Sequence, residues 1–251
     1  MKIFRISVLL IILILTAFYS KLQRLQSTAW VEPLQLAIYP INADQHAATA
    51  QYIQTLSLTD FKQVPQFFDK QWLQYSELGF SPIDLQLMPV ITAKPPAPPQ
   101  NNNRLLIAIW SLRLRFWAYR HAQTASKSTV NIFIQYQQFD KSKRLAHSLG
   151  LQKGLIGVVN AYADVSYQET NNVVLAHELL HTVGASDKYN MQTGQPIYPD
   201  GFARPDQQYQ QSKAEIMAAR VPLNAAESEM AQSLRYCVIG LKTAQEISWI
   251  E

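Results

Sequence analysis

Cysteine and histidine are scarce in this chain of 251 residues. The single cysteine, Cys237, excludes an intrachain disulfide and a cysteine-rich zinc ribbon. Of the five histidines, only His177 and His181 have a spacing typical of metal ligands, and His147 is expected to be a loop residue or to support such a site. None of the ten asparagines begins an Asn-X-Ser/Thr acceptor, which is a slight indication against a glycosylating pathway.

Acidic residues are absent from the first 24 positions, which hold four basic ones. These four account for the whole formal charge of +4, so the rest of the chain is neutral. The excess of positive charge is therefore no evidence for nucleic-acid binding, and no nucleic-acid partner is expected. The segment from Lys94 to Lys153 is basic, with Asp140 as its lone acid, and we interpret this imbalance mainly as solvated charge.

An apolar run from Ile6 to Tyr19 has basic residues on both sides and predicts a targeting segment. It is shorter than the roughly 20 residues of a full membrane span, which suits a signal peptide or a short anchor. Phe18 is a poor cleavage-site residue, so we expect residues 1–25 to remain as an anchor. The charge bias predicts a single-pass inner-membrane protein whose domain, 26–251, faces the periplasm of a bacterium.

The segment 177–187 reads His-Glu-Leu-Leu-His-Thr-Val-Gly-Ala-Ser-Asp. On a helix, His177 and His181 lie one turn apart on the same face, so both imidazoles can reach a single Zn²⁺. Glu178 lies beside them, where it can take a proton from a water on the metal. The pattern indicates a zinc site with a carboxylate base.

Gly184 follows an apolar stretch and can adopt a positive φ, so the helix should end there and the chain should return Asp187 toward the metal. The pattern His-Glu-x-x-His-x-x-Gly-x-x-Asp resembles the metzincin zinc peptidases, in the minority whose third ligand is Asp. These enzymes also have a methionine turn, for which Ala214–Ala218, with Met217, is a candidate. The resemblance covers the carboxy-terminal part of the chain, from about Leu155.

The resemblance implies an α+β fold with a mixed sheet and helices in an upper lobe, a zinc-binding helix, and a small carboxy-terminal lobe with the methionine turn. It further implies that His177, His181 and Asp187 bind Zn²⁺, that Glu178 is the general base of peptide-bond hydrolysis, and that Met217 packs without ligating. A protein or peptide substrate follows from this activity.

Two departures from the family pattern leave alternatives open. In gluzincin-type enzymes a distant Glu completes the zinc site, so Glu215 competes with Asp187 as third ligand. Many metzincins have a Tyr two residues after the turn methionine, but position 219 is Ala. Tyr189 and Tyr198 are candidates for that role.

The residue pattern also predicts the elements around the motif. Strands are expected at 34–39, 85–92, 130–136 and 155–163, and helices at 44–56, 61–75, 104–121, 225–235 and 243–249. The helix 104–121 should pack on the sheet through one stripe: Leu105, Ile109, Leu112, Phe116 and Tyr119. Asn171 or Asn172 should cap the zinc-binding helix.

Two expectations concern the substrate cleft. In metzincin-like enzymes the strand before the zinc-binding helix is a sheet edge that holds the substrate, so Gly157–Asn160 either pairs with a peptide or is an ordinary buried strand. The loop 188–212 should form the lower wall of the cleft.

Two other functions remain compatible with the motif. The chain could be a non-catalytic zinc-binding interaction protein of the envelope, or a zinc hydrolase that acts on cell-wall amide bonds.

Overall fold

The computed structural model describes residues 27–251 except 77–78, 102 and 123–128, together with scattered positions before residue 27. Most of the predicted anchor, including Phe18's neighbours, therefore lies outside the described residues. Within the part of the chain that is described, no helix is both long and apolar enough to cross a membrane.

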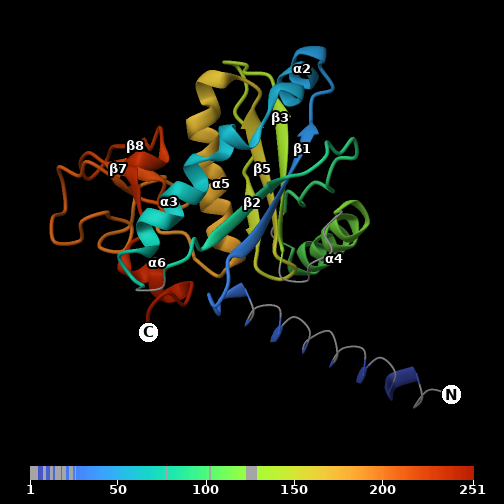
Figure 1. Cartoon of the computed structure of the whole chain (residues 1–251), viewed down its shortest axis with the longest axis horizontal. Coiled ribbons are helices and arrows are strands. Elements are labelled where there is room, and N and C mark those ends of the chain that lie inside the picture. The colour runs from blue at the N-terminus through green and yellow to red at the C-terminus, as the bar shows by residue number, and fades with distance from the viewer. Residues whose placement is uncertain are drawn as a thin grey trace.

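A five-stranded sheet forms the centre of the larger lobe (Figure 1). Its spatial order is β2-β1-β3-β5-β4; β4 is antiparallel to β5, and the other pairs are parallel. The strands are β1 (Leu34–Asn42), β2 (Ile83–Leu87), β3 (Val130–Gln137), β4 (Leu149–Leu151) and β5 (Ile156–Tyr162). The central strands are buried on both faces, which explains why they read as almost continuous apolar runs.

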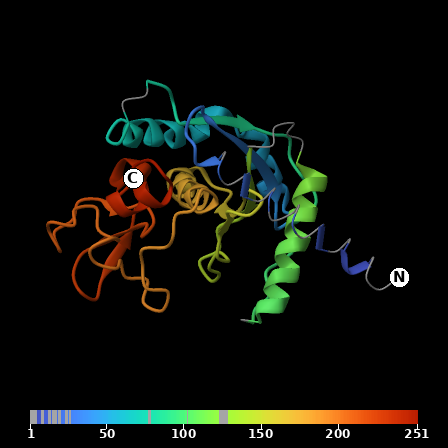
Figure 2. The ribbon, with the colours of Figure 1, turned by 90° about the horizontal axis from the view of Figure 1, so that it is seen from below.

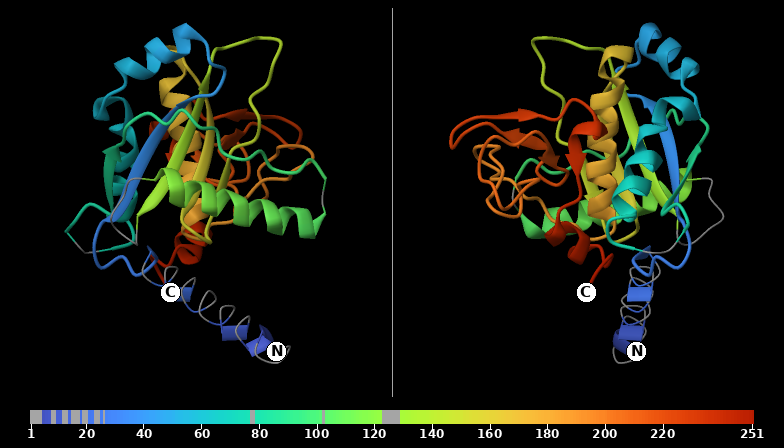
Figure 3. Two further views of the ribbon diagram at one scale, coloured as in Figure 1. Left: turned by 90° about the vertical axis from the view of Figure 1, so that its right-hand side faces the viewer. Right: turned by 60° about the vertical axis from the view of Figure 1, so that its left-hand side comes forward.

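Helices cover both faces of this sheet (Figures 2 and 3). They are α2 (Ala47–Thr55), α3 (Gln63–Trp72), α4 (Arg104–His121) and α5 (Gln168–Thr182), with short 3₁₀ turns at Leu58–Phe61 and Val165–Tyr167. The larger core cluster lies between the sheet, α3 and α5, whereas α4 packs against a smaller cluster on the opposite face. The zinc-motif helix α5 is thus held between the sheet and the rest of the protein.

The carboxy-terminal lobe contains a second sheet of four short strands in the order β8-β7-β6-β9. These are β6 (Ala214–Glu215), β7 (Arg220–Pro222), β8 (Ser228–Met230) and β9 (Cys237–Val238), with a 3₁₀ turn at Leu234–Tyr236 and the helix α6 (Leu241–Glu246). The α+β class is therefore confirmed.

The predicted helix 225–235 is wrong, because this segment is half of a β-hairpin. The Asn224 side chain accepts hydrogen bonds from the backbone N–H groups of Ala226 and Glu227. This Asx-type turn reverses the chain and pairs β8 with β7. The predicted helix 243–249 is shifted, and forms as α6.

Strand β1 extends beyond the predicted range 34–39 and continues through Pro40. It pairs with β3 as far as Asn42, while its pairing with β2 stops at Ile38. The Pro40 carbonyl accepts from Ile91 on the β2 side, so the proline nitrogen faces the side where the regular ladder has already ended. A missing N–H costs little there. The predicted strand 85–92 is correspondingly shorter, as β2.

Apolar side chains of the predicted helix 61–75 pack in the core: Phe61 of the 3₁₀ turn and Val64, Phe68 and Trp72 of α3 are buried. The stripe predicted for α4 is wrong: its five residues are all exposed, and the opposite face, with Leu114 and Ala118, is buried. Since α4 carries apolar side chains on nearly every side, periodicity could not decide which face meets the sheet.

Helix α5 begins before the predicted cap. Gln168 is its first residue, and Asn171 and Asn172 lie inside it. Asn171 donates to the carbonyl of Tyr162, and Asn172 donates to the carbonyl of Asp60. The two amides tie the zinc-motif helix to β5 and to the turn before α3.

Candidate metal centre

The orientation of both imidazoles is fixed by backbone carbonyls. The Nδ1 of His177 lies 2.9 Å from the Ile216 oxygen, and the Nδ1 of His181 lies 2.8 Å from the Ala185 oxygen. A carbonyl can only accept, so each Nδ1 carries the proton and each neutral ring keeps a free lone pair on Nε2. Hydrogen bonds of this kind orient histidine ligands in metal sites.

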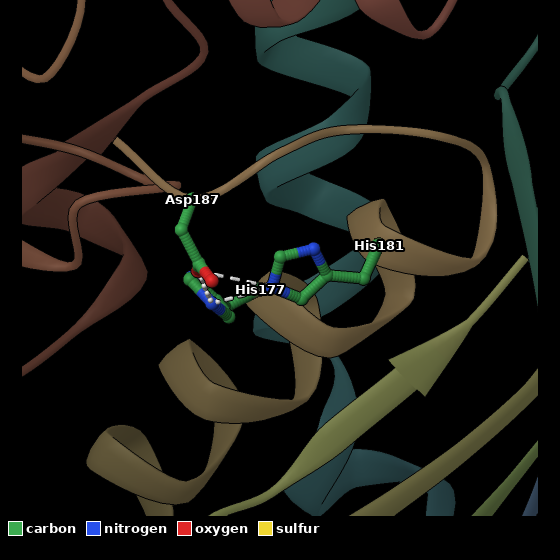
Figure 4. A group of neighbouring side chains, drawn as sticks. All are labelled: His177, His181 and Asp187. Carbon is green, nitrogen blue, oxygen red and sulfur yellow. Dashed lines mark hydrogen bonds and ion pairs between the residues drawn. The ribbon is translucent and has the colours of Figure 1, made fainter. Parts of the chain in front are cut away.

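Gly184 ends the helix as predicted, with a φ of +111°, a conformation that L side chains rarely adopt. Its N–H donates to the His181 carbonyl, and the chain then reverses. The return brings Asp187 Oδ1 to 3.2 Å from His177 Nε2 and 3.1 Å from His181 Nε2 (Figure 4). The three residues meet at one point.

The donor set fits a small cation. The two Nε2 atoms are 3.1 Å apart, so three lone-pair-bearing atoms face one another without a proton between them when the rings are neutral. Ligands about 2.0–2.1 Å from a tetrahedral Zn²⁺ lie about 3.3 Å from each other, close to the separations seen here. Together with the two imidazoles and the carboxylate, this geometry makes His177, His181 and Asp187 the group that could hold a metal.

The electrostatics of the cluster also favour positive charge. Burial lowers the pKa of His177, but the hydrogen bond to Asp187 and the charge of Glu178 outweigh it and raise the pKa overall. Burial raises the pKa of Asp187, but its contacts with His177 and His181 outweigh burial and bring the pKa well below its usual range. Both directions are those expected of a cluster whose surroundings favour positive charge.

Glu178 is buried next to this cluster. The residue is only 5% exposed, and its Oε2 atom has no hydrogen-bond partner among the described residues. Burial raises the pKa of Glu178, and the nearby imidazoles oppose that rise only in part. An unpartnered buried carboxylate oxygen is costly, and such groups concentrate at functional sites.

Glu215, the alternative third ligand, is committed elsewhere. Its two oxygens accept four hydrogen bonds, from Met217 N (2.6 Å), Ala218 N (3.2 Å), Gly240 N (3.2 Å) and Thr243 Oγ1 (2.7 Å). The structure brings Asp187, and not Glu215, to the two histidines. Glu215 instead ties the methionine turn to the start of α6.

The candidate methionine turn, Ala214–Ala218, contacts both His177 and the loop that carries Asp187. Met217 is fully buried, and its carbonyl accepts from the Lys188 N–H in the ligand loop. The neighbouring Ile216 carbonyl contacts the His177 ring. Ala219, which follows, has a φ of +55° and closes the turn. The segment thus supports the zinc-motif helix and the loop that carries Asp187.

The residues on either side of Asp187 are held by Glu246, at the end of α6. Its carboxylate accepts from Ser186 N (2.9 Å) and Ser186 Oγ (2.8 Å), and it forms a 2.6 Å ion pair with Lys188 Nζ. Lys188 is buried and also donates to the Ser186 carbonyl. Sequence reasoning missed Glu246, because nothing in the chain near it marks a partner about 60 residues earlier.

Of the two candidate tyrosines, only Tyr189 lies near the cluster. Its ring is 6.4 Å from the His177 ring, and burial together with the charges of Asp187 and Glu178 raises its pKa. Tyr198 donates to the Pro205 carbonyl in the long loop instead.

The edge of the sheet beside the cluster is β4, not β5. Gly157 pairs with Gly150 of β4, so of the two alternatives for Gly157–Asn160 the structure has the ordinary interior strand and not the sheet edge. Asn160 is covered by Ser148 and His147. Sequence patterns missed β4 because it has only three residues.

Gly150 explains how this edge comes so near the metal cluster. A Cβ at position 150 would clash with the Glu178 carbonyl and the His181 side chain, so only glycine permits the approach. A groove of about 380 Å³ lies beside this edge. Its lining includes Gly150–Lys153 of the edge and Ser111 of α4, and His181 is the one residue of the cluster that borders it.

Comparison with known proteins adds no assignment. The sequence matches no protein-family model, and no curated protein matches it significantly.

Proposed function

We propose that this chain is a zinc-dependent peptidase of metzincin-like fold. The observation that carries the proposal is the convergence of His177 Nε2, His181 Nε2 and Asp187 Oδ1 within 3.2 Å of one another, beside the buried and unpartnered carboxylate of Glu178. The glycine turn, the buried Met217 and the antiparallel edge strand next to the motif helix also support it.

Each group has a distinct role in this proposal. Zn²⁺ held by the three ligands would polarise a carbonyl and lower the pKa of a water molecule. Glu178 accepts the proton of the attacking water and delivers it to the leaving amine nitrogen, and its raised pKa suits both transfers. Glu178 is not a ligand.

The edge strand β4 is proposed to hold the substrate. Its backbone beyond Gly150 borders the groove, and an extended peptide can add to such an edge through main-chain hydrogen bonds. Tyr189, near His177, is proposed to contact the reacting carbonyl.

We also propose that residues 1–25 anchor the protein in the inner membrane, with residues 26–251 on the periplasmic side. The basic flanks of the apolar run and the poor cleavage site at Phe18 support this placement. Mass analysis of the purified native protein tests it: a mature amino terminus between residues 17 and 26 would show a cleaved signal instead.

The test of activity is chelator-sensitive cleavage of unfolded proteins by the full-length chain, with recovery on adding Zn²⁺. Glu178→Gln should retain zinc and fold but lose activity by about 10²–10⁴-fold. The matched control is Glu229→Gln, because Glu229 is an exposed carboxylate on β8. Near-normal turnover of Glu178→Gln would remove Glu178 from the mechanism.

The same preparation separates the alternatives. Hydrolysis of cell-wall material but not of proteins would indicate an amide hydrolase of the envelope. Bound zinc with no hydrolysis of either substrate would indicate a binding protein.

A further inference from the structure

Helix α4 exposes a continuous apolar stripe. Five residues spaced three or four apart point away from the sheet: Leu105 (67% exposed), Ile109 (44%), Leu112 (59%), Phe116 (62%) and Tyr119 (83%). The opposite side of α4 packs on Tyr39, Phe133 and Val158 of the sheet. Figures 2 and 3 show that no described element covers the outer side of α4. A stripe of this size on a soluble surface marks an interaction site.

Arginines flank the stripe on both sides. At about 100° per residue, Arg113 and Arg120 fall along one margin, and Arg104 and Arg115 fall along the other. The helix contains no acidic residue, and none of the four arginines forms a salt bridge within the described part of the chain. Arg120 lies over the Phe116 ring, 5.9 Å from its centre. The charge next to the apolar surface is therefore entirely positive and uncompensated.

A hollow of about 350 Å³ opens beside the stripe. Two cations, Lys94 and Arg113, line it together with Phe116 and Trp117. Its other wall contains Pro96, which is held in place because Trp110 Nε1 donates to the Pro96 carbonyl at 2.8 Å. The hollow thus offers two cations to a phosphate group.

We propose that α4 docks on the surface of an anionic phospholipid bilayer. The stripe would enter the boundary between headgroups and acyl chains, while the arginines and Lys94 bind lipid phosphates. The uncompensated positive margins match a uniformly negative surface, and a second copy of this chain would bring the same charges face to face. The proposal is independent of the metal cluster.

The placement of α4 would bring the groove beside His181 to the membrane surface. Ser111, on the inner side of α4, lines the groove beside His181. Docking would hold the groove close to the bilayer. This consequence, unlike the docking itself, rests on the proposed function: the accessible substrates would then be chains or loops at the membrane surface. Only residues 20–29 separate the apolar run from Trp30, which is fixed in the core by a hydrogen bond to the Ile247 carbonyl.

The test uses the full-length chain in vesicles, with an environment-sensitive fluorophore on Leu112→Cys. The native Cys237 is buried and should not compete for the label. In phosphatidylcholine vesicles containing phosphatidylglycerol, we expect blue-shifted emission that is quenched by lipid-borne nitroxides. The same label on Gln54→Cys, an exposed position on α2, should show neither effect.

Charge variants distinguish the possible occupants. Each lysine or arginine near an anionic membrane contributes about 1 kcal/mol, so Arg113→Gln and Arg120→Gln should each lower the docked-to-undocked ratio by about fivefold. Phe116→Glu should abolish docking, whereas Leu73→Glu, at another exposed apolar residue, should not.

Three outcomes would overturn the proposal. The label on α4 could remain unquenched on anionic vesicles; its quenching could be the same with and without phosphatidylglycerol; or its blue shift could grow with protein density in vesicles of phosphatidylcholine alone. The last result would assign the stripe to a second copy of the chain.

Discussion

Helices α5 and α4 lie on opposite faces of one sheet, and both are rich in apolar residues, yet they use these residues differently. Helix α5 buries ten of its fifteen residues, including His177 and Glu178, whereas α4 buries two of eighteen. The reason is their position: α5 lies between the sheet and the carboxy-terminal lobe, and α4 has the sheet on one side only. Apolar content alone therefore does not tell whether a helix is core or surface.

The two helices differ more clearly in the partners of their polar residues. Polar side chains in α5 have specific partners: Asn171 bonds the Tyr162 carbonyl, and His177 bonds the Ile216 carbonyl. The four arginines of α4 form no salt bridge with any described residue. The candidate metal ligands are thus supported by defined hydrogen bonds, whereas α4 presents an exposed surface.

The largest expected effect separates the two acidic candidates for the third ligand. Glu215→Ala should lower the free energy of unfolding by at least about 3 kcal/mol, because each buried donor left unpaired costs about 1–3 kcal/mol. Asp187→Ala should instead abolish tight zinc binding. In the presence of a chelator, its free energy of unfolding should be about the same as that of the wild type. Urea unfolding in chelator and zinc titration measure the two effects.

Loss of zinc from a stably folded Glu215→Ala protein would contradict this. It would move the centre to the gluzincin type and leave Asp187 without a role in binding the metal.

The sequence could predict the parts of the site that lie close together along the chain. The cluster of His177, His181 and Asp187 spans eleven residues, so helical periodicity and one glycine are enough to assemble it. The support from Glu246 and the approach of Gly150 depend on contacts between distant segments, and no local pattern encodes them.

The second prediction tests the orientation of α4 by comparing two leucines two residues apart. Leu114 is fully buried, so Leu114→Ala should destabilise the protein by about 2–5 kcal/mol. Leu112 is 59% exposed, and Leu112→Ala should change stability by no more than about 0.5 kcal/mol. Chemical denaturation measures both. Equal losses would mean that the outer side of α4 is covered in the native protein.

The orientation of α4 could not be predicted for a related reason. Its ends, Arg104 and His121, were correct, because Asn103 caps the helix locally by accepting from two backbone amides. The choice of buried face depends on which side meets the sheet, where Tyr39 and Phe133 stack 5.1 Å apart and receive Trp117. That information lies in other strands.

The third prediction concerns the positioning role of Glu246. Glu246→Ala frees Ser186 and Lys188, which hold the two sides of Asp187, so zinc affinity should fall by about 10–100-fold, as for other residues that orient ligands. The conservative Glu246→Gln should recover part of the loss, because an amide oxygen can still accept from Ser186. Glu229→Ala is the matched control. Unchanged zinc affinity in Glu246→Ala would limit Glu246 to a structural role.

The smallest expected effect is the pH dependence of the same contact. Burial works against the charged form of Glu246, but Lys188 and Ser186 outweigh it and hold the pKa below its usual value of about 4.3. A lowered pKa in the folded state means that the contact stabilises the protein above the unfolded pKa and loses this effect as the pH falls through the folded pKa.

The stability difference between wild type and Glu246→Gln should therefore be constant above about pH 5, and should shrink below that. Urea unfolding of both proteins in chelator over this range measures the difference, and protonation of the metal cluster cancels because both chains contain it. The expected size is about 1 kcal/mol, and a difference that grows as the pH falls would show that Glu246 is protonated in the native protein.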